Sequence, residues 1–299
     1  MNFDIILTIF FIIFCSFLIL KNKIFIYAFI KTLYKNYNII SNLQKSLANE
    51  KQRTKEEKKL AKILVPRKEV NCRGANFTLS SENWITNYRW ESFDAKEPET
   101  LDWIDNEIKE GDIFFDIGSN VGVYSIYAAK KYSNIKVISI ECEYSNLHLL
   151  KENIIHNSLG EVIIPYSIGL GDKEEISYLN IQDFTPGSAM HSVSTKKIEK
   201  TFEDQKVIWR EGIAKISIDF FCKSTGIKPN CMKIDVDGGE NNIFIGAEET
   251  FKKEYLRTLL IEISRDSINY KECENFLVHS GFYLSSEVEE RSNQVWIRR

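Results

Sequence analysis

The fold is decided by Phe114-Phe115-Asp116-Ile117-Gly118-Ser119-Asn120-Val121-Gly122. In this stretch an apolar strand ends on a carboxylate, enters a turn with two glycines and opens into a helical run over 124–131. Glycine takes up positive φ and lets a ligand approach the backbone closely. The helix N-terminus behind the turn presents free N–H groups and the positive end of the helix dipole. The stretch therefore predicts a site for a nucleotide-like cofactor.

Length, charge and cysteine content exclude several classes of protein. The 299 residues suffice for one large or two small domains. The net charge of −3 gives no support to a nucleic-acid partner, because domains that bind nucleic acids are usually basic. The six cysteines form no Cys-x-x-Cys pair, so neither a zinc site nor a redox motif is predicted, and reduced thiols of a cytoplasmic protein are favoured.

The N-terminal segment predicts a membrane anchor over residues 1–22. Residues 3–20 are almost wholly apolar, and a bilayer core is spanned by about 20 apolar residues. Lysines follow this run and none precedes it, so the positive-inside rule predicts a single-pass protein whose catalytic domain is cytoplasmic. An interfacial helix and a signal peptide are the alternatives, although a signal peptide normally has a basic start and small residues at the cleavage site.

Residues 23–70 are expected to link the anchor to the rest of the chain. The apolar run 24–34 carries Lys31 and suits the membrane interface. Residues 45–69 are dense in Lys, Glu and Gln, which favours an exposed helix. The catalytic domain is expected over 71–299.

From residue 72 onward, short apolar runs alternate with helical stretches. This order predicts an α/β fold with a mainly parallel sheet covered on both faces, and two final short strands that form an antiparallel hairpin. Ligands of such sheets bind beyond the C-terminal strand ends, near the point where the strand order reverses. Asp116, Glu141 and Asp235 each end an apolar strand, so they are expected to gather along one edge.

The acid beside the glycine turn selects the kind of cofactor. The turn lacks the Gly-x-Gly-x-x-Gly of dinucleotide sites and the Gly-Lys-Ser/Thr of phosphate loops. A carboxylate repels pyrophosphate but suits a cation, and S-adenosylmethionine carries a sulfonium and an ammonium. Glu141 is then placed to accept hydrogen bonds from ribose hydroxyls. The structural alternatives are a helix N-cap for Asp116 and a solvated loop acid for Glu141.

Three blocks of the sequence resemble the FkbM-type methyltransferase family. They are DIGSNVG, ISIECEYSNLHLLKENI and KIDVDGGENNIFIGAEETF, in the family's order, and the resemblance covers about residues 90–299. It implies a Rossmann-like class I methyltransferase fold with a seven-stranded sheet, S-adenosylmethionine as methyl donor, and sugar or glycan hydroxyls as acceptors. The departures are mild: Cys142 replaces a usual proline, Ser119 a usual alanine, and Asp237-Gly238-Gly239 a usual Glu-Gly-Ala.

The resemblance also implies roles for single residues. Glu141 is expected to hold the ribose, and Ser167 and Ile168 to border the adenine. The methionine end of the cofactor is expected in the first block, at Asp116, Gly118, Ser119, Asn120 and Gly122.

Methyl transfer to an alcohol needs a proton acceptor within hydrogen-bond reach. Asp235 is the first candidate, and His191, in the long insertion before Asp235, is the second. Glu240 either contributes to the site or caps its own helix, and Lys233 is expected to point outward from its strand. The clustering of Asp235, Asp237 and Glu240 leaves a metal as an open alternative, but no metal is predicted.

Together these features predict a membrane-anchored O-methyltransferase that acts on a sugar, a glycan or a glycolipid precursor at the cytoplasmic face. Its expected partners are the membrane and a sugar or small-molecule acceptor, with no nucleic acid. Two alternatives stay open: a methyltransferase of protein amines or small metabolites, and a non-catalytic scaffold tethered to the membrane. The insertion over 180–215 has no predictable structure.

Overall fold

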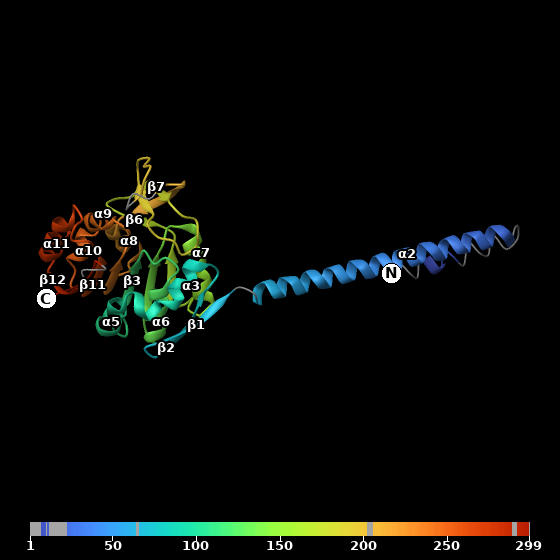
Figure 1. Ribbon diagram of the computed structural model, residues 1–299, viewed down its shortest axis with the longest axis horizontal. Coiled ribbons are helices and arrows are strands. Elements are labelled where there is room, and N and C mark those ends of the chain that lie inside the picture. Colours follow the sequence, from blue (N-terminus) through green and yellow to red (C-terminus); the bar gives the residue numbers. More distant parts are fainter. Residues whose placement is uncertain are drawn as a thin grey trace. The chain divides into compact units, whose positions relative to one another are not determined.

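The protein is described by a computed structural model, which covers residues 7–9, 11, 23–63, 66–201, 206–288 and 292–298. The chain divides into two compact units, Met1–Leu64 and Val65–Arg299. The helix of the first unit, α2, runs over Lys23–Ile63 (Figure 1). The apolar run 24–34 was expected at the membrane interface and the charged segment after it as an exposed helix; the structure places both in one helix. The function of α2 as a linker stays a prediction.

The expected membrane anchor is corrected. Apart from 7–9 and 11, residues 1–22 lie outside the described part of the chain. Within the part that is described, no helix is both long enough and apolar enough to cross a bilayer. In α2, Lys31 and Lys35 interrupt the apolar first turns and a Lys- and Glu-rich segment follows, so a run of about 20 apolar residues is missing. The predictions of a single-pass membrane protein and of a membrane partner are therefore not supported.

A seven-stranded sheet forms the centre of the second unit, in the order β12-β13-β11-β10-β3-β4-β5. The five strands from β11 to β5 are parallel, whereas β12 and β13 form an antiparallel hairpin at one edge, as predicted. The strands are β3 (Ile113–Ile117), β4 (Lys136–Ile140), β5 (Ile163–Tyr166), β10 (Cys231–Ile234), β11 (Thr258–Glu262), β12 (Phe282–Val288) and β13 (Asn293–Arg298). The order reverses between β3 and β10, which is where such sheets bind ligands.

Helices cover both faces of this sheet, because alternate residues of each strand point to opposite sides. Phe114 packs into a core formed with α5, α6 and α7, while its neighbour Phe115 packs into the opposite core. The helices are α3 (Trp84–Glu91), α4 (Phe93–Lys96), α5 (Pro98–Glu107), α6 (Val123–Lys131), α7 (Tyr144–His156), α8 (Ile218–Thr225), α9 (Glu240–Ile245), α10 (Glu248–Phe251) and α11 (Tyr270–His279).

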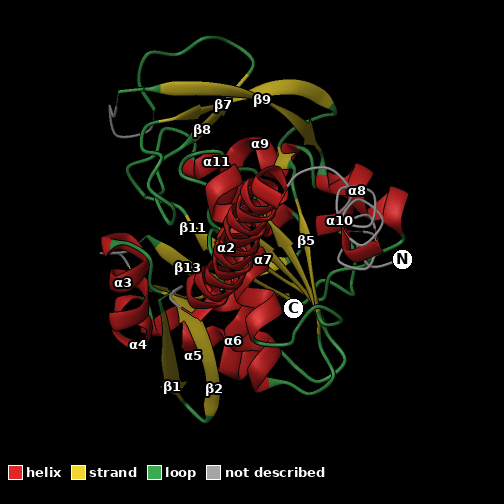
Figure 2. Cartoon of the chain, turned by 90° about the vertical axis from the view of Figure 1, so that its right-hand side faces the viewer, coloured by secondary structure: helices red, strands yellow, loops and turns green. Residues whose placement is uncertain are grey.

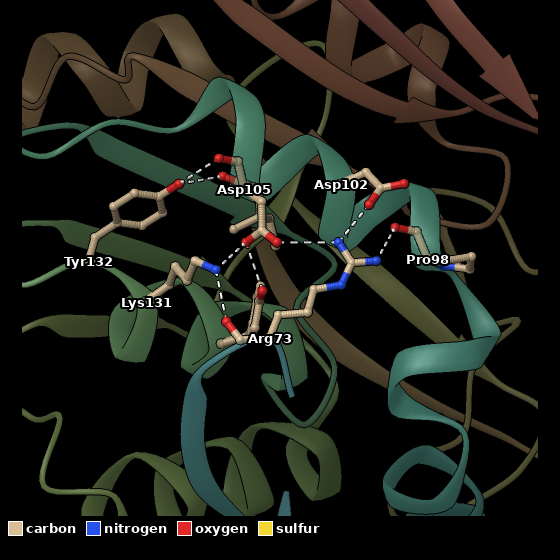
Figure 3. A network of polar contacts seen from close by, with 8 residues as sticks. Arg73, Pro98, Asp102, Asp105, Lys131 and Tyr132 are labelled. Atoms are coloured by element: carbon tan, nitrogen blue, oxygen red, sulfur yellow. Dashed lines mark hydrogen bonds and ion pairs between the residues drawn. The ribbon is translucent and has the colours of Figure 1, made fainter. Parts of the chain in front are cut away.

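A leading hairpin, β1 (Arg67–Cys72) and β2 (Ala75–Ser80), packs against α6 and α7. Its turn is held by a polar network shown in Figure 3. The Arg73 guanidinium lies 2.6 Å from a carboxylate oxygen of Asp102 and 3.3 Å from one of Asp105, and Lys131 donates to the Arg73 carbonyl oxygen at 3.0 Å. These contacts join the hairpin turn to α5 and α6.

The insertion forms a second sheet of four strands, in the order β6-β9-β7-β8. We call it the cap sheet; its strands are β6 (Gly169–Leu170), β7 (Glu175–Ile181), β8 (Ser192–Ser194) and β9 (Trp209–Ile216). Figure 2 shows β7, β8 and β9 at one end of the second unit, with β1 and β2 at the opposite end. The segment without predictable structure therefore contains β8 and most of β9.

Candidate active site

The glycine turn connects β3 to α6 and packs closely against the end of β10. Gly118 has φ +75°, and a Cβ atom there would lie only 1.8 Å from the carbonyl oxygen of Asp235. Gly122 has φ +81° and is the N-cap of α6. The amides of Gly118 and Ser119 both donate to the carbonyl oxygen of Ile140, at 3.0 and 3.1 Å. Gly118 is thus required by the contact between two strand ends.

Asp116 is buried at the end of β3, with only 1% of its surface exposed. Its Oδ2 accepts a hydrogen bond from the Ser125 hydroxyl at 2.5 Å, and Ser125 also contacts the Ser139 hydroxyl at 2.7 Å. Its Oδ1 has no partner among the described residues. Burial raises the pKa of Asp116 above the usual carboxyl value, against the opposing effects of Lys233 and Ser125. A buried carboxylate oxygen without a partner is a position for a positively charged hydrogen-bond donor.

Glu141 follows β4, and its carboxylate holds the glycine turn by accepting a hydrogen bond from a backbone amide of the turn. Its Oε2 accepts from the amide of Asn120 at 2.9 Å, and its Oε1 accepts from the amide of Glu143 at 2.7 Å. Burial raises the pKa of Glu141 to about 7, although these amides oppose the shift. Each carboxylate oxygen can accept a second hydrogen bond, so Glu141 can still bind a hydroxyl.

Lys233 does not point outward, contrary to expectation. It is 2% exposed, its ammonium lies 2.5 Å from Oδ2 of Asp235, and it stands 5.3 Å from the centre of the Tyr124 ring. The sheet register explains this placement, because Lys233 is directly opposite Asp116 on the neighbouring strand. Side chains of opposed residues lie on the same face of a sheet.

Three further acids lie near Lys233. Glu262, at the end of β11, is hydrogen-bonded to Asp235. Glu97 is 6% exposed and lies before α5, and Asp237 accepts a hydrogen bond from the amide of Met190 at 2.7 Å. Burial and the charge of Asp235 raise the pKa of Asp237 to about 6. Among the described residues, no three His, Cys, Asp or Glu side chains are placed to hold a metal ion.

The loop over 186–191, between β7 and β8, is fixed to the central sheet by side chains. The Ser188 carbonyl oxygen accepts from Asn120 Nδ2 at 2.8 Å and from Asn146 Nδ2 at 3.0 Å. Arg89, on α3, donates two hydrogen bonds to the Gly187 carbonyl oxygen, at 2.9 and 2.6 Å. Asn120 therefore connects the glycine turn directly to this loop.

A cavity of about 570 Å³ lies between the C-terminal strand ends and the cap sheet. Its volume is in the range typical of small-molecule sites. Four buried polar atoms of its lining residues lack a partner in the described part of the chain: Asp116 Oδ1, Ser119 Oγ, Ser177 Oγ and His191 Nδ1. Burial lowers the pKa of His191, whose Nε2 lies 3.2 Å from the Ser188 hydroxyl.

Most of the predicted site residues line this cavity. They are Asp116, Gly118, Ser119, Asn120, Glu141, Ile168, His191 and Asp235. Gly122 lies behind the turn against Leu150, and Ser167 is exposed outside the lining. Glu240 is also outside the lining; it is buried and accepts from the Gly238 amide at 3.2 Å, in agreement with its structural alternative. Their roles in binding and catalysis stay predictions.

Sequence reasoning missed Glu262, Glu97 and Tyr124, which line the cavity as well. Glu262 had a usable signal, because it ends the apolar strand β11 as Asp116 ends β3. Glu97 and Tyr124 had none, since they reach the site only through the packing of helices against the sheet.

Comparisons with known proteins agree with this geometry. The profile of the TRM5/TYW2 methyltransferase domain matches residues 90–207. The Beauveria bassiana protein named Methyltransferase 1 is 20% identical over 183 residues, which cover 58% of this chain and 72% of that protein. The protein is an S-adenosylmethionine-dependent methyltransferase.

Two solved structures illustrate the similarity of this methyltransferase to others. TYW2 from M. jannaschii, in complex with AdoMet, is 14% identical with a TM-score of 0.36, and the match covers 78% of this chain and 87% of that one. Aeropyrum pernix fibrillarin, with bound S-adenosyl-L-methionine, is 11% identical with a TM-score of 0.41 over 77% and 81% of the two chains. The predicted class I Rossmann-like fold is confirmed by the strand order of the central sheet, and the predicted cofactor by the match to the TRM5/TYW2 methyltransferase domain.

The expected relationship to FkbM-type methyltransferases is wrong, because the matching profile is that of a different family. Residues of all three blocks that suggested it line the cavity, so these blocks indicate the kind of site more strongly than the family. The expected partners, a membrane and a sugar or small-molecule acceptor without nucleic acid, are corrected: the matching profile is that of the TRM5/TYW2 methyltransferase domain, and no helix of the described residues could cross a bilayer.

The residues of the cavity fit the cofactor. The partnerless Asp116 Oδ1 suits an ammonium group, and Glu141 keeps free capacity to accept from hydroxyls. The side chains that line the cavity include nine acids against five Lys and Arg. This excess of acids favours a cationic ligand over a phosphate.

Proposed function

We propose that this methyltransferase modifies a base of a structured RNA, with tRNA as the first candidate. The observation that carries the proposal is the TRM5/TYW2 match over 90–207. That span includes the glycine turn, Glu141 and the loop over 186–191, so it covers both the cofactor side and the cap side of the cavity.

The charge of the cavity constrains how an RNA binds. The excess of acids over Lys and Arg in the lining disfavours phosphates, so the RNA backbone stays outside and only an uncharged base enters. Enzymes that modify a base inside a structured nucleic acid commonly turn that base out into a pocket. A cavity of about 570 Å³ beyond the strand ends is compatible with the reacting parts of cofactor and base.

The cap sheet offers aromatic surface outside the cavity. Trp209 and Phe184 are each about half exposed, with ring centres 6.2 Å apart. The exposed Arg210 stacks on the Tyr178 ring, with its guanidinium carbon 4.6 Å from the ring centre. Aromatic rings and arginine are the groups on which unpaired bases stack. These pairs support an RNA-binding role for the cap sheet.

Within this proposal the main predicted residues that line the cavity keep their roles. Asp116 binds the ammonium of the cofactor, Glu141 its ribose, and Ile168 borders the adenine. Asp235 accepts the proton of the acceptor, with His191 as the second candidate. The cofactor supplies an activated methyl group, so the protein contributes orientation and electrostatics.

The test is a transfer assay with radiolabelled S-adenosylmethionine and fractionated cellular RNA. The label should enter an RNA fraction of tRNA size, be released by ribonuclease and persist after protease treatment. The Asp116→Ala variant is the matched control and should transfer nothing. Label that is removed by protease and retained after ribonuclease would overturn the proposal in favour of a protein amine.

A further inference from the structure

A stripe of charge crosses the C-terminal ends of three neighbouring strands on one face of the central sheet. Asp116 lies opposite Lys233, and Lys233 lies opposite Leu260, two residues before Glu262. Side chains two residues apart on a strand share a face. The stripe therefore consists of Asp116 on β3, Lys233 and Asp235 on and after β10, and Glu262 on β11.

Lys233 is the cation at the centre of this stripe. Its side chain is 2% exposed, and its Nζ is 2.5 Å from Asp235 Oδ2. Its other charged neighbours are Asp116 and Glu97. A buried ammonium is costly without such partners, and the same ammonium stabilises whichever carboxylate it contacts in the charged form. It contacts Asp235.

Asp235 and Glu262 are hydrogen-bonded to each other. Two carboxyl groups so close together disfavour a second negative charge, which raises the pKa of one of them. The position of Lys233 decides which, because its Nζ contacts Asp235. Glu262 is therefore the neutral member, and it donates its hydrogen bond to the Asp235 carboxylate.

We propose that Lys233 is a positioning residue for methyl transfer: its buried ammonium keeps Asp235 ionised and oriented as the proton acceptor, while the protonated Glu262 fixes the other side of that carboxylate. This inference rests on the methyltransferase activity and on the role proposed for Asp235, and it holds for any acceptor with an N–H or O–H. This role explains why the Lys233 ammonium lies among acids, which in the described residues form no group placed to hold a metal ion.

The ionisation of the pair agrees with this geometry. Burial alone would raise the pKa of Asp235, but Lys233 and the hydrogen bond from Glu262 outweigh it and hold that pKa below the usual value. Burial and the Asp235 charge raise the pKa of Glu262 well above the usual value.

Further charged or titratable groups face Asp235 and Glu262 from the helices and strands that pack around them. Glu97, before α5, and Tyr124, on α6, face it from the helices, and both feel the charge of Asp235. Lys96, at the end of α4, lowers the pKa of Asp235. Asp237 follows β10, and Asp116 lies on β3; burial raises the pKa values of both, and the charge of Asp235 adds to the rise. Lys233 has the largest charge effect on Asp235, after burial itself.

The step that uses this arrangement is balanced. The nucleophilic atom of the acceptor forms a bond to the methyl carbon while the carbon–sulfur bond breaks, and that electron pair stays on sulfur. The proton of the acceptor passes to the Asp235 carboxylate, which needs no oxidant or reductant. A protonated Asp235 could not accept it, so the step depends on the ammonium beside it.

The test compares Lys233→Met with Lys136→Met, the same change at an exposed lysine of β4. Carboxyl titrations followed by ¹³C NMR report the ionisation of Asp235 without any acceptor. In Lys233→Met, Asp235 should titrate at least one pH unit higher than in the wild type, and Lys136→Met should leave it unchanged. Glu262→Gln assigns the second signal, which should disappear.

A second variant and a folding measurement complete the test. Lys233→Gln fills the same space without charge and should give the same upward shift if Lys233→Met does not fold; S-adenosylmethionine binding reports folding. An unchanged Asp235 titration in either folded variant would overturn the inference.

Transfer to RNA should fall in these variants at the acidic end of the pH profile, where the raised pKa of Asp235 leaves it protonated, and recover as the pH is raised and Asp235 ionises. Lys233→Arg keeps the charge and should keep the wild-type pH profile. If wild-type protein transfers no methyl to RNA, the proposed acceptor is wrong, and the NMR titration still decides the role of Lys233.

Discussion

The central sheet and the cap sheet enclose one cavity, but they are constructed in opposite ways. Central strands are covered on both faces, and even the charged Asp116 at the end of β3 is 1% exposed. The cap sheet is covered on one face only, so Ile176 on β7 is 78% exposed. This difference indicates a division of labour: the central sheet fixes the cofactor and the reacting groups, and the cap sheet presents a surface to the acceptor.

The largest expected effect concerns a matched pair of glycines, one in each region. Gly118→Ala should destabilise the protein by about 3 kcal/mol or more, because the new Cβ would lie 1.8 Å from a backbone oxygen at positive φ. Gly212→Ala on β9 should change stability by less than about 0.5 kcal/mol, because nothing lies within 4 Å of its Cβ position. Denaturant unfolding of both variants measures this contrast, and equal losses would contradict it.

The next effect tests the cofactor side. Asp116→Asn keeps the shape of the side chain but removes the charge that faces the ammonium, so the Kd for S-adenosylmethionine should rise about 10- to 100-fold. Ser125→Ala removes only the hydrogen bond to Asp116 Oδ2 and should cost about threefold to tenfold. Calorimetry provides both values. An Asp116→Asn variant that binds like the wild type would remove Asp116 from the cofactor site.

The same contrast explains what the sequence could predict. The central sheet and its edge hairpin followed from the alternation of apolar runs and helices. Asp116, Glu141 and Asp235 followed from one rule, that strand-end residues of parallel strands meet at one edge. That rule also applied to Glu262, which was overlooked.

The remainder of the site depends on contacts between distant segments. Lys233 faces inward because a register pairs it with Asp116, and no local pattern states that register. The cap sheet pairs β7 with β9 across the loop that carries β8, and such pairing leaves little trace in local periodicity. The family could not be inferred from blocks that mainly describe cofactor binding.

The third effect concerns the acids of the cavity. Burial raises the pKa of Glu141 to about 7 and that of Asp237 to about 6. The folded state therefore holds more protons than the unfolded chain between about pH 4 and 7, and the stability of the cofactor-free protein should decline as pH rises through that window. Binding of the cationic cofactor should gain about tenfold from pH 5.5 to 8, because these acids become ionised.

Calorimetric titrations at several pH values test this effect, with Asp116→Asn as the control that keeps both acids. Thermal unfolding should show the decline in stability without cofactor and a larger upward shift by cofactor at pH 8 than at pH 5.5. A cofactor affinity that stays constant over this range would mean that the acids stay charged throughout, and the burial argument would be wrong.

The smallest effect belongs to the cap sheet and tests the division of labour from its other side. Trp209→Ala should raise the KM for RNA about fivefold to tenfold, because stacking of a base on an aromatic ring contributes about 1–3 kcal/mol. The Kd for S-adenosylmethionine and kcat should stay near the wild-type values, since Trp209 is outside the cavity lining. Phe220→Ala, which removes a similarly exposed ring on α8, is the matched control and should change none of the three.

If Trp209→Ala weakens cofactor binding as much as RNA binding, the two sheets do not divide the two ligands. If it changes neither, the acceptor enters by another face.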